Sequence, residues 1–208
     1  MMGEVSFGLI LAAALLASAS PGPATLALSG TAMAQGRVPA LWLAFGITTG
    51  SLVWSVAAAF GLSAIMFANV WMFQLMRYVG AAYLLYLAVK SARAALHPGA
   101  VQPVSLGAEV GRRMYLKGLA LHITNPKAIL FFGALYAVAV PADASPGVLF
   151  AVILVVGLQS TIIFHGFALL FSSEPIARLY FKARRGFEAL FAIGFGAAAA
   201  KILTARLE

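Results

Sequence analysis

The chain has 208 residues, of which 62% are apolar and only 10% are charged, a composition typical of an integral membrane protein. At about 20 residues for each crossing, this length holds six transmembrane helices with short loops and no separate soluble domain. The absence of cysteine excludes disulfides, thiol catalysis and soft-metal sites. The net charge is +8, and the basic residues cluster between apolar segments, a distribution that cytoplasmic loops explain better than nucleic acid binding does.

The first predicted helix covers residues 4–19 and ends at the motif Ser20-Pro21-Gly22-Pro23, after which residues 24–35 continue as a second half-helix. A proline inside a helix removes a backbone donor and clashes with the preceding turn, so the motif breaks the helix. Ser20 is a good N-cap and Pro21 suits the first helical position, so we expect a new helix to begin there. The run before the motif lacks the positive start of a signal peptide, and we expect it to be retained.

Two unbroken helices are predicted next, over residues 39–66 and 70–92. Gly46 and Gly50 of the first form a small-xxx-small pair, which in membranes favours close packing against another helix. Residues 93–113 are the longest polar stretch and are interpreted as a linker between two halves of the chain.

The fourth predicted span, residues 114–140, is broken at Asn125-Pro126-Lys127, where Asn125 is a good N-cap and Pro126 takes the first helical position. Two further spans follow, over residues 147–171 and 187–203. A basic loop over residues 174–186 is expected between them.

The order of broken helix, long helix and short helix occurs twice. Because each half has an odd number of spans, the second half must be inverted relative to the first. We therefore predict an all-α integral membrane protein of six transmembrane helices, built as two inverted three-helix repeats with the first and fourth helices broken. It forms one transmembrane domain over residues 1–208, with repeat 1 at about 4–92 and repeat 2 at about 114–206.

Lysine and arginine residues predict the orientation, since they favour cytoplasmic loops. Most of the 14 fall in one set of loops, namely Arg37, Lys90, Arg93, Arg112, Arg113, Lys117, Arg178, Lys182, Arg184 and Arg185. The others are Arg77, Lys127, Lys201 and Arg206. The linker is therefore expected in the cytoplasm, with both termini outside.

The two predicted half-helix N-termini offer free N–H donors and the positive ends of helix dipoles, which suit a carboxylate. Lys127 adds a full charge, although an ammonium in a span can also snorkel or pair with a backbone carbonyl. The candidate substrate-binding residues are Ser20, Pro21, Gly22, Pro23, Asn125, Pro126, Lys127 and Gln159.

Two histidines within spans, His122 and His165, are candidates for carrying a proton, and each can equally be a neutral, hydrogen-bonded imidazole. The carboxylates are all expected at span ends or in loops, at Glu4, Glu109, Asp143, Glu174, Glu188 and Glu208. A cation would require an acid in the interior, so the sequence favours zwitterions, which carry their own carboxylate.

The chain resembles the LysE/RhtB family of amino-acid exporters over nearly its whole length. The resemblance is carried by Ser20-Pro21-Gly22-Pro23, by Gly46 and Gly50, and by Asn125-Pro126-Lys127. The resemblance implies proton-driven export across the bacterial cytoplasmic (inner) membrane, with Pro21, Gly22, Pro23, Asn125, Pro126 and Lys127 at the site. We expect a neutral substrate similar to homoserine, threonine or leucine. The expected partners are this amino acid, a proton and the lipid bilayer, with a homodimer left open and no nucleic acid.

Two other classes of function were compared with this one. An intramembrane enzyme would require a nucleophile with an oriented base or a cluster of metal ligands, and His122 and His165 lie on different spans, so we expect neither catalysis nor a cofactor or metal site. A cation or heavy-metal exporter of the same fold is the alternative, although thiolates and interior acids are missing from the sequence.

Overall fold

The computed structural model describes residues 5–20, 22–68, 70–97, 111–141 and 143–204, and this part of the chain is helical apart from short connections. The helices are α1 (Phe7–Ala19), α2 (Pro23–Gln35), α3 (Arg37–Ala68), α4 (Val70–Leu96), α5 (Arg112–Ile123), α6 (Pro126–Ala139), α7 (Pro146–Phe171) and α8 (Glu174–Thr204). The prediction of an all-α protein is confirmed.

Membrane-spanning character is clearest in two helices. α3 over Arg37–Gly61 and α7 over its whole length are each long and apolar enough to cross a membrane, and α1 and α2 meet the same test together as one bent pair. The chain is therefore a multi-pass membrane protein.

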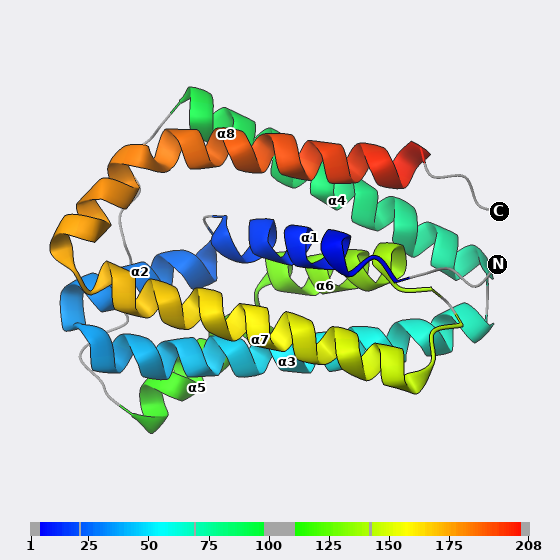
Figure 1. The fold of residues 1–208 in the computed structure, drawn as a ribbon, viewed down its shortest axis with the longest axis horizontal. Helices are drawn as coiled ribbons and strands as arrows, with labels where there is room; N and C mark the ends of the chain where they lie inside the picture. Colours follow the sequence, from blue (N-terminus) through cyan, green and yellow to red (C-terminus); the bar gives the residue numbers. More distant parts are fainter. Residues whose placement is uncertain (1–4, 21, 69, 98–110, 142, 205–208) are drawn as a thin grey trace.

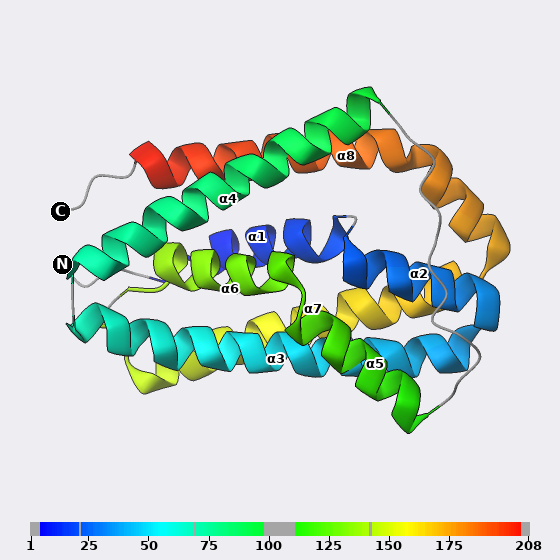
Figure 2. The same cartoon turned by 180° about the vertical axis from the view of Figure 1, so that it is seen from behind.

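The helices lie in layers along the long axis of the molecule (Figure 1). α4 packs along α8 on one side, and α3 packs against α7 and α5 on the other, while α1, α2 and α6 lie between these two groups (Figure 2). Buried residues of the central helices, such as Ile10 and Phe132, join Phe195 of α8 and Val152 of α7 in one apolar core.

Each broken pair packs against the long helix of the other half of the chain: α1 and α2 contact α7, and α5 and α6 contact α3. The two pairs run in opposite directions, α1–α2 from one end of the molecule and α5–α6 from the other (Figure 1). Both breaks are thereby brought to the middle of the molecule.

Glycines allow the backbones of α3 and α5 to touch. A Cβ at Gly46 would fall on the carbonyl oxygen of Tyr115, and one at Gly118 would fall on the carbonyl oxygen of Leu43. A Cβ at Gly50 would stand 2.8 Å from Cβ of His122. The small residues of the two helices therefore fix how closely α5 approaches α3.

Residues 174–186 were predicted to be a basic loop, and this prediction is wrong, because they form the first part of α8. Arg178 pairs with Glu174 one turn earlier at 3.5 Å, and the ring of Tyr180 meets that of Phe171 edge-on with centroids 4.7 Å apart. Arg178, Lys182 and Arg185 are exposed on this helix, whereas Arg184 is largely buried, a difference that charge counting alone does not reveal.

Glu188 was expected at a span end or in a loop, and the structure shows that it is a buried residue of a helix. It lies inside α8 with only 4% of its surface exposed, on the same face as Phe191 and Phe195 of the core. Arg184, one turn earlier, places Nη2 3.5 Å from Glu188 Oε1. A buried carboxylate is tolerated here because a guanidinium on its own helix compensates its charge.

Candidate functional site

The first break separates α1 from α2 by a bend of 54°. The sequence predicted that Ser20 caps the new helix, and this prediction is wrong. Ser20 instead ends α1, and its hydroxyl donates to the carbonyl oxygen of Ala17 at 3.1 Å. The new helix begins later, with Gly22 extended at the N-cap and Pro23 as its first residue. Pro23 is thus the proline whose fixed φ starts the helix, while Pro21 lies outside the described residues.

The second break has the predicted geometry. Asn125 is the N-cap of α6, its side-chain oxygen accepts a hydrogen bond from the backbone N–H of Lys127 at 3.0 Å, and Pro126 is the first helical residue. The two starts differ in one respect: α6 is capped by its own Asn125, whereas no side chain caps α2. The N–H groups at the beginning of α2 therefore remain available to a ligand.

Both breaks open onto one cavity in the middle of the molecule, which holds roughly 460 Å³ of empty space counting its open side. The residues that line it are Ala14, Ala17, Ser18, Gly22, Ala24, Thr25, Ser51, His122, Asn125, Lys127, Ala128, Phe131, Phe132, Val156, Ser160 and Phe164.

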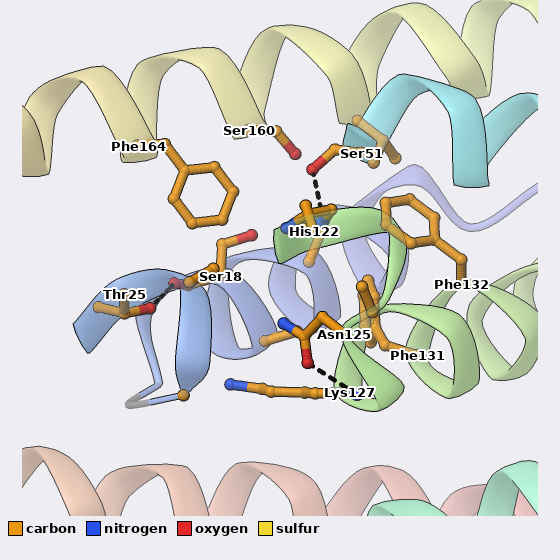
Figure 3. A pocket seen from close by; sticks show the side chains of 16 residues that line it. Ser18, Thr25, Ser51, His122, Asn125, Lys127, Phe131, Phe132, Ser160 and Phe164 are labelled. Atoms are coloured by element: carbon orange, nitrogen blue, oxygen red, sulfur yellow. Dashed lines mark hydrogen bonds between the residues drawn. The ribbon is translucent and has the colours of Figure 1, made fainter. Parts of the chain in front are cut away.

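Lys127 connects the two breaks across this cavity (Figure 3). Its Nζ donates to the carbonyl oxygen of Ser20 at 3.0 Å and to the hydroxyl oxygen of the same residue. The ammonium thus lies at the C-terminal end of α1, where the helix dipole is negative, while its own backbone lies at the positive N-terminal end of α6. Its stem passes Gly22, where a Cβ would stand 3.2 Å from Lys127 Cδ.

His122 lines the cavity from the last turn of α5 and is 5% exposed. Its Nε2 lies 3.0 Å from the hydroxyl oxygen of Ser51 on α3, and its ring meets Phe164 of α7 edge-on. The other ring nitrogen, Nδ1, is buried without a hydrogen-bond partner in the described structure. A buried polar nitrogen in this state is available to a ligand.

The sequence did not single out the remaining wall of the cavity. It consists of hydroxyls at Ser18, Thr25, Ser51 and Ser160 and aromatic rings at Phe131, Phe132 and Phe164. One signal was present: Ser51 follows the start of α3 by the same number of residues as Ser160 follows the start of α7. A matched polar position in corresponding spans of two repeats is a reason to expect a shared site.

Of the predicted site residues, Gly22, His122, Asn125 and Lys127 line the cavity, whereas Ser20, Pro23, Gln159 and His165 are not among its lining residues. Gln159 donates through Nε2 to the carbonyl oxygen of Leu11 at 2.8 Å and so joins α7 to α1. His165 has Nδ1 2.9 Å from the carbonyl oxygen of Thr161, and its ring meets Phe45 edge-on with centroids 4.3 Å apart. Of the two histidines, His122 is the one that the fold brings to the breaks.

The chemistry of the cavity follows from this lining. It presents an ammonium, an uncapped helix start, several hydroxyls and an aromatic wall, and no carboxylate is among the described residues that line it. Such a site can bind a small solute by its anionic group and surround its side chain with apolar and hydroxyl groups.

The family model described as LysE type translocator matches residues 15–206. The chain is 29% identical to the threonine efflux protein of Escherichia coli (strain K12) over 88% of its length and 91% of that protein, and 30% identical to the leucine efflux protein of Klebsiella pneumoniae over 73% and 71%. It is 31% identical to the homoserine/homoserine lactone efflux protein of Salmonella typhimurium over 65% of each chain. No solved structure matches.

Proposed function

The chain belongs to the LysE type translocator family, and from this premise we propose that it exports neutral amino acids from the bacterial cytoplasm in exchange for protons. Membership makes it a membrane transporter and not an enzyme. The names of its relatives, which export threonine, homoserine or leucine, support an amino acid as the substrate.

The observation that carries the substrate class is the charge of the cavity lining. Lys127 is present and no carboxylate lines the cavity in the described residues. A basic amino acid or a metal cation would bring a second positive charge next to this ammonium without a carboxylate in the lining to bind it, whereas a neutral zwitterion brings its own carboxylate. The lining thus supports neutral amino acids over the alternative of a cation or heavy-metal exporter.

Substrate binding is proposed to use the start of α2 and Lys127 together. In the structure Lys127 Nζ donates to the hydroxyl oxygen of Ser20 and, at 3.0 Å, to its carbonyl oxygen. The substrate carboxylate replaces this oxygen and also accepts hydrogen bonds from the uncapped N–H groups at Ala24 and Thr25, which border the cavity. The side chain of the amino acid then lies against Phe131, Phe132 and Phe164.

Transport is proposed to follow alternating access of two inverted repeats around this cavity. The opposite directions of α1–α2 and α5–α6, and the packing of each pair on the long helix of the other half, support such repeats (Figure 1). In this proposal α4, the α5–α6 pair and α8 complete the six crossings.

The orientation is proposed from charge. α3, α5 and α8 begin, and α4 ends, at one end of the molecule, where Arg37, Arg93, Arg112 and Arg178 lie (Figure 1). Under the positive-inside rule this end faces the cytoplasm and the termini face outward.

The test is efflux of radiolabelled threonine, homoserine, leucine and lysine from proteoliposomes containing the purified protein, set beside protein-free liposomes. We expect efflux of the neutral amino acids and little efflux of lysine. In cells, overproduction should relieve growth inhibition by the neutral substrate and leave tolerance to cadmium or cobalt unchanged. Faster export of lysine than of threonine and leucine, or a gain in metal tolerance alone, would contradict the proposal.

A further inference from the structure

The ring nitrogen Nδ1 of His122 has no role in the proposed binding of the substrate carboxylate by Lys127 and α2. The side chain is 95% buried, lines the cavity and has Nε2 within 3.0 Å of the Ser51 hydroxyl, while Nδ1 has no hydrogen-bond partner in the described structure. An amino-acid substrate has a second charged group, its ammonium, for which the lining offers no carboxylate. A bound amino acid would therefore place its ammonium, a donor without a partner, in the cavity that His122 lines with an unpartnered ring nitrogen.

The ring of His122 is held in place by its surroundings. Gly50 of α3 is so close that an added Cβ would stand 3.2 Å from the ring atom Cδ2, and Phe164 of α7 lies edge-on with ring centroids 5.9 Å apart. Ser51 holds Nε2 from α3. These contacts hold the ring, and with it Nδ1, in one orientation at the wall of the cavity.

Within the described structure, the charged side chain whose field reaches His122 is Lys127 of α6. α3 faces His122 with Gly50 and Ser51, and α7 faces it with Phe164, none of which titrates in the physiological range. A second cation on His122 therefore has no acid beside it in the described lining, and a substrate carboxylate on Lys127 is the group that changes the local charge.

We propose that Nδ1 of His122 is one acceptor used in turn by the substrate ammonium and by the transported proton. In this proposal Nε2–H donates to Ser51 Oγ, which leaves the lone pair of Nδ1 for one of these two ligands. The inference rests on the proposed function, because it requires that the cavity bind an amino acid.

The exchange follows from the single lone pair. On the outer side a proton binds Nδ1, the ring becomes an imidazolium, and the hydrogen bond from the substrate ammonium is lost, which releases the amino acid. On the cytoplasmic side the imidazolium gives this proton to water, and the ammonium of a new substrate donates to Nδ1. One proton enters for each amino acid that leaves, and no covalent bond of the substrate changes.

The test uses threonine as the probe, in proteoliposomes with the wild-type protein and three variants. His122→Asn retains an acceptor near the position of Nδ1 that cannot be protonated, whereas His122→Gln can reach Ser51 and loses the acceptor at Nδ1. His165→Asn is the matched control, since His165 lies away from the cavity lining. Each protein is assayed for threonine–threonine counterflow without a pH gradient and for threonine accumulation driven by a pH gradient.

We expect His122→Asn to lose gradient-driven accumulation while its counterflow falls less than that of His122→Gln, in which the apparent KM of counterflow should rise about tenfold or more. His165→Asn should keep both activities. In the wild type, the apparent KM for threonine should rise as the pH falls, with Vmax unchanged, because proton and ammonium compete. Accumulation by His122→Asn at the wild-type level, or a wild-type KM independent of pH, would overturn the inference. Absence of wild-type counterflow with every amino acid tested would instead refute the proposed function.

Discussion

Lys127 is the residue whose replacement separates a ligand-binding role from a structural one. Lys127→Ala removes the charge and leaves Pro126 and the Asn125 cap in place, so α6 should still form. A charge-assisted hydrogen bond contributes about 1.5–3 kcal/mol, which corresponds to a loss of apparent affinity of roughly tenfold to a hundredfold. Radiolabelled efflux at several concentrations of neutral amino acid measures this change.

Lys127→Arg keeps the charge in a different shape and should retain part of the activity. Lys182→Ala, which removes an exposed lysine of α8, is the control and should behave as the wild type. If Lys127→Ala exports with unchanged affinity at an equal membrane level, the bond from Lys127 to Ser20 is purely structural.

Glu188 and Glu174 allow the stability lost with a buried ion pair to be compared with that lost with an exposed one. Both are joined to an arginine one turn away on α8 at 3.5 Å, but the side chains of Glu188 and Arg184 are 5% and 16% exposed, against 79% and 72% for Glu174 and Arg178. Removing one partner of a buried pair costs about 3 kcal/mol or more, whereas an exposed pair contributes about 0–1 kcal/mol.

We therefore expect Glu188→Ala to lower the melting temperature of the protein in detergent by several degrees and Glu174→Ala to leave it nearly unchanged. Equal melting temperatures for the two variants would mean that water or lipid headgroups reach Arg184 when Glu188 is absent.

At the scale of helices, the crossing of α3 and α5 depends on the absence of a side chain at Gly46. In Gly46→Ala the new methyl group meets the backbone of Tyr115 and Leu119, so the two helices must separate and carry His122 away from Ser51. Overpacking of this kind typically costs about 1–3 kcal/mol. Gly61→Ala, also in α3, is the control, because nothing lies within 4 Å of its added Cβ.

The measurement is the amount of folded protein recovered in detergent, together with efflux per molecule recovered. Gly46→Ala should reduce both, and Gly61→Ala should reduce neither. Normal recovery and efflux for Gly46→Ala would show that the contact between α3 and α5 can open without loss.

The order of the helices could be predicted from the sequence because prolines and hydrophobic runs act locally. Asn125 followed by Pro126 indicates a helix start wherever it occurs, and the structure has one there. Ser20 misled the prediction, since Gly22 and Pro23 two and three residues later also form a start, and the hydroxyl of Ser20 was satisfied by the preceding turn instead. The burial of Glu188 could not be predicted from its position in the sequence, because it depends on which face of α8 packs against the core.

The pairing of residues across the cavity could not be predicted in the same way. The contact of Ser51 with His122 and the contact of Lys127 with Ser20 join residues far apart in the chain, and they depend on how α3, α5 and the two breaks pack. Polar residues in apolar spans indicated His122 as a candidate, but only the packing distinguishes it from His165 and Gln159.

For the whole molecule, the absence of cysteine allows a direct test of orientation, because a single introduced cysteine is the one thiol in the chain. The connection from α6 to α7, which contains Asp143, and the start of α8, which contains Arg178, lie at opposite ends of the molecule (Figure 1), and both residues are exposed. In intact cells a membrane-impermeant maleimide should label Asp143→Cys, and it should label Arg178→Cys only after the membrane is permeabilised. The reverse pattern would invert the proposed topology.

The bond from Lys127 to Ser20 also bears on when such a transporter would work. The carboxylate of an amino acid that enters the cavity competes with the carbonyl oxygen of Ser20 for Lys127, and this oxygen is part of the protein itself. If this internal ligand is worth about 1.4 kcal/mol, it weakens apparent affinity about tenfold. Export would then respond to an about tenfold higher range of cytoplasmic substrate concentration, so that the protein removes the amino acid mainly when it accumulates and little of it when it is scarce.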